Sequence, residues 1–331
     1  MRKNAQKEQE FINNIKNFHF SYSSLNKLLF SPSLFYKDYI LFDRELRTDK
    51  HLVEGKLLHL LLLQPDRLHD EFSITPSKIP SDNLRMVLQN ITLYTDVPEL
   101  SLVEDKIILD SLKEIGLYQS MKDEDKRIAK VRTTECEDYY AFKANTGNTD
   151  VIDNTMLAKA TERVELMLNN ASIKSLLLDE PTDFEMDGLE VYNEKFMTCK
   201  LDKYEFGLHG YIDRYTINHD KKEINIIDLK TTNKTITDFP NTIEFYNYWL
   251  QAAVYVTLVL KNLGDKEVNY KISFNFIVID KYDQIYNFPV SVKTMDEWGD
   301  GLESILDMVN YHVTENNYEL PYQFIKGEVI L

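Results

Sequence analysis

The C-terminal half of this 331-residue chain alternates strand-forming and helix-forming segments, and their order leaves few folds open. In chain order the segments are strands over 194–201, 206–217 and 223–231, a helix over 243–262, strands over 271–280 and 284–292, and a helix over 294–314. The first three strands follow one another through short polar turns, which indicates a meander. The whole order predicts an α/β fold with a central mixed β-sheet flanked by helices.

The N-terminal half has a mainly helical pattern. Apolar residues recur at helical spacing within 21–41, 51–63 and 154–178. Ser31 followed by Pro32 is typical of a helix start, and Gln64-Pro65 is typical of a helix end. We therefore predict a polar leader over 1–20, a mainly helical part over 21–180 and a sheet-containing core over 181–331.

The overall charge and the cysteine count exclude several classes of protein. The chain has 38 Lys and Arg against 54 Asp and Glu, a formal charge of −16, so contacts with DNA must be local. Its two cysteines cannot supply a four-cysteine zinc site or an iron–sulfur cluster. The longest apolar run, 57–63, is too short to span a membrane, and the N-terminus lacks a secretory signal. We predict a cytoplasmic protein without membrane contact.

Two charged residues interrupt the apolar segment INIIDLKTT. Asp228 and Lys230 are separated by one residue, so in a strand their side chains lie on the same face, about 7 Å apart along the chain. Charged residues are depleted in strands, and this strand is too apolar for a solvent-facing edge. The pattern indicates either a site that uses a carboxylate beside an ammonium or a structural ion pair.

A second acid, Asp213, lies in the strand segment just upstream. The polar turn between the two segments predicts neighbouring strands, which would bring Asp213 next to Asp228. Carboxylates held close together repel each other, so such a pair indicates a bound cation or a shared proton. Gly210 would keep the backbone bare for a close approach, although a glycine within a strand is also typical of a bulge.

Two helical segments contribute further polar residues. His59 lies among leucines one turn after Gly55, where it is either a ligand or a core histidine. Gln251 and Tyr255 are spaced i, i+4 on the apolar helix, so they share a face and can hydrogen-bond to the same object.

The segment 121–132 carries basic residues mixed with acids. Its candidates for gripping a DNA backbone are Lys126, Arg127, Lys130 and Arg132. A solvated helix face explains the same pattern, because acidic residues dilute the positive charge.

Taken in order, the candidate residues form a series of short motifs. These are GKLLH at 55–59, a Glu before a hairpin, GYID at 210–213, DLK at 228–230 and QAAVY at 251–255. The series resembles the PD-(D/E)XK nuclease superfamily, in particular its RecE-like and RecB-like exonucleases. The phrases YSSLNKLLFSPSLFYK and GKLLHLLLLQPDRLHDEF are similar to phage and prophage enzymes of the RecE type. The resemblance implies a restriction-endonuclease-like core with a helical N-terminal region.

The resemblance implies a metal site and a catalytic lysine. Asp213 and Asp228 would be the metal-binding carboxylates, His59 a further ligand and Lys230 the catalytic lysine. The expected cofactor is Mg²⁺, or Mn²⁺, because His is a less usual partner for Mg²⁺. The superfamily's iron–sulfur variants need four cysteines, so no such cluster is expected.

The remaining family roles fall on one acid and two helix residues. Glu194 is our choice for the early acid of the family, while Glu190 and Glu185 compete with it. Gln251 and Tyr255 would touch the substrate or brace the metal site.

The activity implied by the resemblance is hydrolysis of phosphodiester bonds from the ends of linear double-stranded DNA, in phage or prophage recombination. The implied partners are DNA, a single-strand annealing protein and further copies of the chain in a ring. Two alternatives stay open. One is a structure-specific or CRISPR-adaptation-type nuclease of the same superfamily, and the other is a catalytically idle nuclease fold that only binds DNA.

Overall fold

The computed structural model describes residues 2–44, 49–147, 149–178, 188–264 and 269–329. The chain forms two compact units. The first unit comprises residues 1–49 together with 165–331, and the second comprises 50–164. The helix α10 (Asn154–Asn169) carries the boundary between them.

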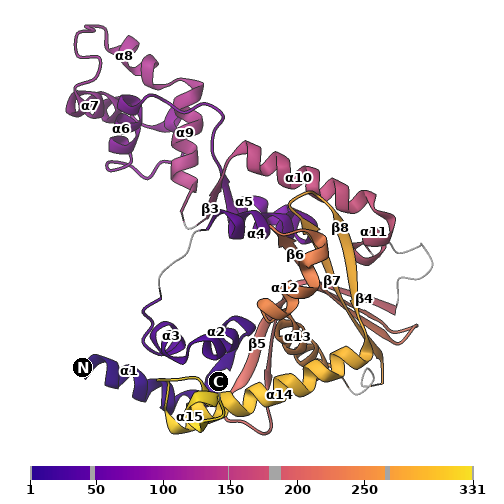
Figure 1. The fold of residues 1–331 in the computed structure, drawn as a ribbon. Coiled ribbons are helices and arrows are strands. Elements are labelled where there is room, and N and C mark those ends of the chain that lie inside the picture. The colour runs from indigo at the N-terminus through magenta and orange to yellow at the C-terminus, as the bar shows by residue number, and fades with distance from the viewer. Residues whose placement is uncertain (1, 45–48, 148, 179–187, 265–268, 330–331) are drawn as a thin grey trace. The chain divides into compact units, whose positions relative to one another are not determined.

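The first unit is built on a mixed β-sheet (Figure 1). Its described strands are β1 (His19–Phe20), β4 (Leu189–Lys200), β5 (Gly207–Asn218), β6 (Glu223–Thr232), β7 (Lys271–Asp280) and β8 (Ile285–Val290). Strand β5 pairs antiparallel with β4 along its whole length and with β6 over Arg214–Asn218. Strand β7 pairs parallel with β6 and antiparallel with β8, while β1 adds two residues parallel to β5.

Helices surround this sheet. They are α1 (Arg2–Asn13), η1 (Ile15–Asn17), α2 (Tyr22–Phe30), α3 (Pro32–Phe35), η2 (Tyr36–Ile40), α11 (Ala171–Leu177), η6 (Ile236–Asp238), α12 (Phe239–Phe245), α13 (Tyr248–Asn262), α14 (Val292–Glu315) and α15 (Tyr322–Lys326). The predicted α/β fold, a central mixed sheet flanked by helices, is therefore confirmed.

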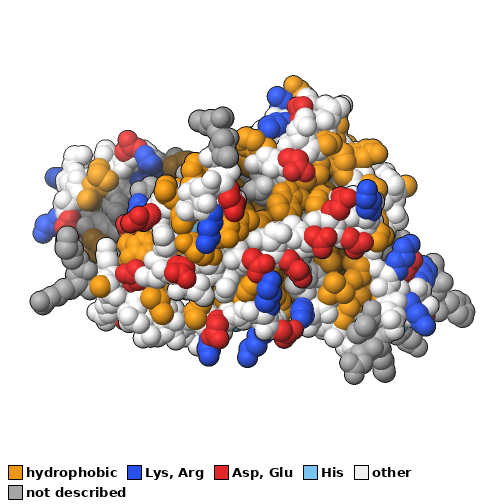
Figure 2. Space-filling model, turned by 60° about the horizontal axis from the view of Figure 1, so that its bottom comes forward, with side chains coloured by type: hydrophobic (Ala, Val, Ile, Leu, Met, Phe, Trp, Pro, Cys, Tyr) orange, Lys and Arg blue, Asp and Glu red, His pale blue; other side chains and the backbone are white. Residues whose placement is uncertain are grey.

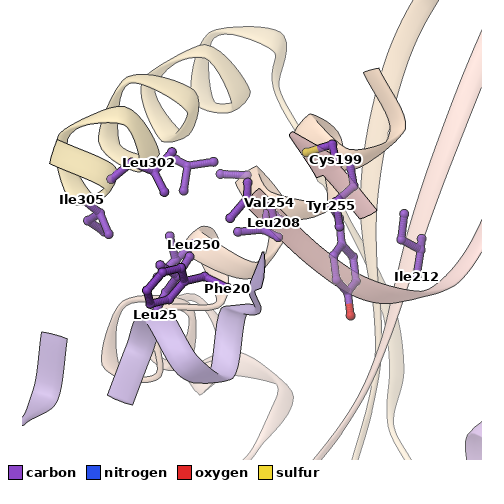
Figure 3. Close-up of a cluster of buried hydrophobic side chains, with 14 of the residues drawn as sticks. Phe20, Leu25, Cys199, Leu208, Ile212, Leu250, Val254, Tyr255, Leu302 and Ile305 are labelled. Carbon is purple, nitrogen blue, oxygen red and sulfur yellow. The ribbon is translucent and has the colours of Figure 1, made fainter. Parts of the chain in front are cut away.

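The core of this unit forms around α13, which packs on β4, β5 and β6 and against α14. Its sequence is apolar on nearly all sides, as expected for a helix buried on most of its surface. Leu250 and Val254 of α13 lie in the same buried cluster as Leu302 of α14 and Leu208 of β5 (Figure 3). Burial of this cluster fixes α13 against the sheet, and with it the backbone positions of the buried residues Gln251 and Tyr255.

Several segments differ from the sequence-based expectation. The predicted helix over 243–262 is two helices, because Asn247 takes a left-handed conformation with φ 55° and interrupts it between α12 and α13. The first strand of the meander begins at Leu189 rather than at Glu194. The segment 1–20, predicted as a polar leader, forms α1 and β1 and buries Phe11 and Phe20 in the core.

The second unit contains a short parallel pair of strands and a separate group of helices. Its elements are α4 (Lys50–Leu63), η3 (Pro65–Arg67), α5 (Leu68–Glu71), β2 (Phe72–Ile74), α6 (Asp82–Ile91), η4 (Leu100–Leu102), α7 (Asp105–Ile115), α8 (Glu124–Val131), α9 (Thr134–Asn145), β3 (Asp150–Ile152) and most of α10. Leu57 of α4 packs with Phe72 of β2 and Ile152 of β3, whereas α6 to α9 enclose a core of their own.

The division into two units differs from the predicted boundaries at 20/21 and 180/181. Residues 21–49 group with the sheet because Leu25 and Phe35 are buried in the same cluster as Leu208. Only the segment 50–164 forms the second unit. Among the described residues, none of the helices has the length and apolar character needed to cross a bilayer.

Candidate active site

The two candidate aspartates lie where β5 and β6 separate. The last pair of this antiparallel ladder is Arg214 with Ile227, so Asp213 and Asp228 are the next residues on either side. A side-chain oxygen of Asp213 accepts a hydrogen bond from the backbone N–H of Leu229, at 2.7 Å, and bridges the gap between the strands. Both carboxylates are buried, with Asp228 0% and Asp213 6% exposed. The predicted neighbourhood of the two acids follows from this register.

Glu194 lies opposite Asp213 on the other edge of β5. In the β4–β5 ladder Asn193 pairs with Arg214 and Lys195 pairs with Ile212, which leaves Glu194 facing Asp213. One carboxylate oxygen of Glu194 lies within 4.8 Å of one of Asp213. Glu194 has a φ of 48°, a left-handed conformation that costs a non-glycine residue about 1–3 kcal/mol. Asp213 is thus flanked by Glu194 and Asp228, and the strained backbone at Glu194 belongs to this arrangement.

Lys230 forms a short ion pair with Asp228. Its Nζ lies 2.5 Å from Oδ2 of Asp228, and the lysine side chain is only 14% exposed. Asp228 and Lys230 lie on the same sheet face as the buried residues Ile224 and Ile226, as the strand alternation predicted. Burial lowers the pKa of Lys230, but the charges of Asp228 and Asp213 outweigh it and raise this pKa above its usual value. Lys230 is therefore held as an ammonium beside the carboxylates.

The helix α13 brings two polar residues to the carboxylates. Nε2 of Gln251 donates a hydrogen bond to the hydroxyl of Tyr255 at 2.9 Å, and both side chains are buried. The Tyr255 oxygen points away from the hydrophobic cluster (Figure 3). Burial raises the pKa of Tyr255, and the charges of Asp213 and Asp228 raise it further, so the phenol keeps its proton.

Gly210 of β5 lies in close contact with α13. A Cβ at this position would lie 3.1 Å from a methyl group of Leu258 and 3.3 Å from the ring of Tyr255. A side chain at this position would require Leu258 and Tyr255 to shift by a few tenths of an ångström, so the glycine of GYID leaves room for Tyr255 against β5.

Two tyrosines near the Asp228–Lys230 pair were not predicted. Nζ of Lys230 lies 4.8 Å from the ring centroid of Tyr248, a cation–π contact. Burial raises the pKa of Tyr22, and so do the nearby Tyr248 and Asp228. Tyr22 belongs to α2, more than 200 residues before Lys230, and only the fold reveals that it lies at the site.

His59 lies on α4 of the second unit. It is half-buried, between the buried residues Leu58 and Leu60. Its role as a metal ligand stays a prediction.

The four basic residues predicted to grip DNA lie on or next to α8. Lys126 pairs with Asp123 at 3.3 Å and Arg127 with Glu124 at 3.5 Å. Arg132 pairs with Asp105 at 2.8 Å, while Lys130 lies in the last turn of α8. On the face drawn in Figure 2, Lys and Arg side chains are scattered among Asp and Glu. These local ion pairs fit a solvated helix face, and DNA contact by these residues stays a prediction.

A family model supplies the identity that this geometry suggests. The model of the PD-(D/E)XK nuclease superfamily matches residues 19–318. The chain belongs to this superfamily. It is therefore a nuclease by family, with DNA as the implied substrate, and nucleases of the PD-(D/E)XK superfamily use divalent metal ions.

Similarity to individual proteins is weaker. No curated protein matches the chain. One solved structure, from Eubacterium rectale and titled as that of a presumed exonuclease, has 13% sequence identity and a TM-score of 0.44. The match covers 96% of this chain and 90% of that one. Membership of the PD-(D/E)XK superfamily thus rests on the family model.

Glu190 and Glu185 are the alternatives to Glu194 as the early acid of the PD-(D/E)XK motif. Glu185 lies outside the described residues. Glu190 is four residues before Glu194 on β4, about 13 Å away along the strand. It accepts a hydrogen bond from Tyr192 at 2.5 Å and contacts His219 at 3.0 Å. Glu190 thus belongs to a separate polar cluster.

We expect Glu194→Gln to lower the rate of DNA cleavage at least about a hundredfold, while Glu190→Gln leaves it unchanged. Loss of a residue that only supports a metal ligand costs 10–100-fold, and Glu194 faces Asp213 directly. Initial rates on end-labelled linear DNA with Mg²⁺ would measure this. Equal losses in the two variants would contradict the assignment of Glu194.

The control variant Glu190→Gln should also change how stability depends on pH. Hydrogen bonds from Tyr192 and His219 hold the pKa of Glu190 below its usual value. The charged form of Glu190 therefore stabilises the fold above its ordinary pKa, and this contribution is lost as the pH falls through the lowered pKa. Glu190→Gln should lower the thermal unfolding midpoint near neutral pH, and the difference from wild type should disappear in acid.

Proposed function

We propose that this protein is a metal-dependent exodeoxyribonuclease that hydrolyses phosphodiester bonds from the ends of linear double-stranded DNA. The observation that carries the proposal is the flanking of Asp213 by Glu194 and Asp228, with the ammonium of Lys230 against Asp228. Three carboxylates and one ammonium group thus lie together where strands β5 and β6 separate. A structural ion pair alone would not need the second and third carboxylate.

The donor set fits a hard divalent cation. Glu194, Asp213 and Asp228 offer oxygen ligands, which Mg²⁺ and Mn²⁺ prefer. A bound cation would relieve the repulsion between neighbouring carboxylates. In this proposal His59 supplies a nitrogen ligand, which favours Mn²⁺ beside Mg²⁺. When bound, the cation supplies Lewis-acid activation of the phosphate and of the attacking water.

The protein's own residues have separate roles in the proposed reaction. Lys230 carries a fixed positive charge, so it can stabilise the negative charge that develops on the phosphoryl oxygens. Asp228 holds that ammonium in place through the 2.5 Å contact. Tyr255 keeps its phenolic proton, and its oxygen already accepts from Gln251, so the O–H can donate to a phosphate or carboxylate oxygen. Gln251 and Tyr255 thereby position the substrate or brace the carboxylates.

The biological setting in this proposal is phage or prophage recombination. What supports it is the resemblance to RecE-type enzymes across several motifs. Those enzymes resect one strand and pass the remaining single strand to an annealing protein, so we propose such a partner and a ring of identical subunits. A ring with a basic inner surface would reconcile the formal charge of −16 with DNA binding.

Metal binding can be tested without DNA. We expect Mg²⁺ or Mn²⁺ to raise the thermal unfolding midpoint of the wild type. At a hundredfold excess over the dissociation constant, the bound cation should add about 2.7 kcal/mol to the free energy of unfolding. Asp213→Asn should lose this response, because it removes the carboxylate between Glu194 and Asp228. His59→Ala should weaken the response to Mn²⁺ more than that to Mg²⁺.

A suitable control for these measurements is Asp307→Asn, since Asp307 is exposed and pairs with Lys203 on the surface. It should respond to the cations as the wild type does. If the wild type showed no cation response and cut linear DNA equally well with a chelator present, the proposed metal dependence would be wrong.

A further inference from the structure

Two aromatic rings are exposed at the break between α12 and α13. Phe245 is 72% exposed and Tyr246 is 43% exposed. Their ring centroids lie 4.8 Å apart in an edge-to-face arrangement. Neither ring fills the core, so burial does not explain why two aromatic residues follow each other here.

A lysine lies over both rings. Nζ of Lys234 is 5.1 Å from the ring centroid of Phe245 and 5.8 Å from that of Tyr246. Phe245, Tyr246 and Lys234 form a surface that we call the aromatic platform. It combines flat apolar ring faces, on which bases can stack, with one positive charge, which can contact a phosphate. This combination is typical of protein surfaces that bind single-stranded nucleic acid.

The backbone of the aromatic platform is held by α2. The carbonyl oxygen of Tyr246 accepts hydrogen bonds from the Tyr22 hydroxyl at 2.5 Å and from the Asn26 amide at 3.3 Å. Nδ2 of Asn247 donates to the side-chain oxygen of Asn26 at 2.7 Å. A segment tied at three points presents its rings in a fixed orientation, which reduces the ordering cost of binding.

The aromatic platform is continuous with the candidate active site. The rings of Tyr246 and Tyr248 lie 5.6 Å apart, and the ring of Tyr248 contacts Nζ of Lys230 at 4.8 Å. Burial raises the pKa of Tyr248, the charge of Lys230 lowers it and the charge of Asp228 raises it, so the ring lies within electrostatic range of both members of the pair. One aromatic ring therefore separates the exposed platform from the Asp228–Lys230 pair.

We propose that the aromatic platform binds unpaired nucleotides of the DNA strand next to the scissile phosphate. Phe245 and Tyr246 stack on the bases, and Lys234 contacts a backbone phosphate. Inside a duplex both faces of a base are already stacked, so the platform selects strands that have opened at an end. Every base has an aromatic face, which makes the contact independent of sequence. This inference rests on the proposed nuclease function and deepens it.

The test compares two platform variants with two matched variants elsewhere. Phe245→Ala and Lys234→Ala alter the platform. The matched variant Phe324→Ala removes an exposed Phe. The matched variant Lys326→Ala removes a lysine that lies over two tyrosine rings, one on α14 and one on α15. We expect Phe245→Ala to raise KM for linear duplex DNA about tenfold, as expected for the loss of one base–aromatic stack, with a much smaller change in kcat. Lys234→Ala should raise KM and reduce its dependence on salt, and the matched variants should behave as the wild type.

A second measurement identifies stacking itself. Linear duplexes carrying one abasic nucleotide, placed in turn at each of the terminal positions of the cleaved strand, offer no base to stack at that point. For the wild type, one of these positions should raise KM about tenfold. Phe245→Ala should show no additional increase at the same position, because the stack is already lost. A purely structural role of Phe245 would instead give additive losses and a lowered unfolding midpoint.

The outcomes separate the two proposals. Two results with a wild type that cleaves linear DNA would overturn the platform inference and leave the proposed nuclease function standing. One is an unchanged KM for Phe245→Ala, and the other is an effect of Phe245→Ala that adds in full to that of every abasic position. If the wild type cleaves no DNA with Mg²⁺ or Mn²⁺, the proposed function fails and the inference fails with it.

Discussion

Replacing Lys230 with Met should lower the rate of DNA cleavage by about 10²–10³-fold, the usual cost of losing one charge-stabilising group in an active site. Methionine keeps the length and apolar stem of the side chain but removes the ammonium that lies 2.5 Å from Asp228. The measurement is the initial rate on end-labelled linear DNA with Mg²⁺. Lys271→Met, at the exposed start of the neighbouring strand β7, is the control and should retain the wild-type rate.

The structure adds a cost in stability to this prediction. Asp228 is fully buried, so removing Lys230 leaves a buried charge without its ammonium, which destabilises a fold by about 3–5 kcal/mol. Asp228→Asn combined with Lys230→Met removes both charges and should recover most of the lost stability while staying inactive. A double variant that recovered activity, or a Lys230→Met variant with near-native turnover, would exclude this pair from the chemistry.

Strand periodicity and one short turn predicted the relative placement of three candidate residues. Asp228 and Lys230 were predicted on one face because strand side chains alternate, and β6 places both with Ile224 and Ile226. The short polar turn between β5 and β6 set a register that leaves Asp213 next to Asp228. Local rules suffice here because the two strands are consecutive in the chain.

The same rules fail where the arrangement depends on distant segments or on an unusual backbone conformation. Glu194 was predicted at a strand start, whereas it lies mid-strand with a φ of 48° that no propensity favours for glutamate. The break at Asn247 was hidden because apolar residues continue on both sides of it. The support of Tyr246 by Tyr22 and Asn26 joins residues more than 200 positions apart, which periodicity cannot reveal.

Linear duplex DNA should be degraded by the wild type, whereas a covalently closed circle of the same sequence should stay intact. In the proposed reaction the aromatic platform stacks only on unpaired bases and the carboxylates are buried, so the strand that reaches Lys230 is one that has opened at a terminus. Gel analysis of both DNAs with Mg²⁺ would measure this, with expected rates that differ by orders of magnitude. Linear DNA whose two ends are closed by hairpins is a matched control, since it keeps length and sequence but lacks a free terminus.

Each other result points to a different member of the nuclease superfamily. Rapid cutting of the closed circle would favour a structure-specific or CRISPR-adaptation-type enzyme, because such a nuclease does not require an end. Cutting of the hairpin-capped DNA but not of the circle would indicate recognition of the hairpin loop, where bases are also unpaired. No cutting of any DNA with Mg²⁺ or Mn²⁺, together with binding of linear duplex, would identify a catalytically idle nuclease fold in which Asp213, Asp228 and Lys230 serve stability alone.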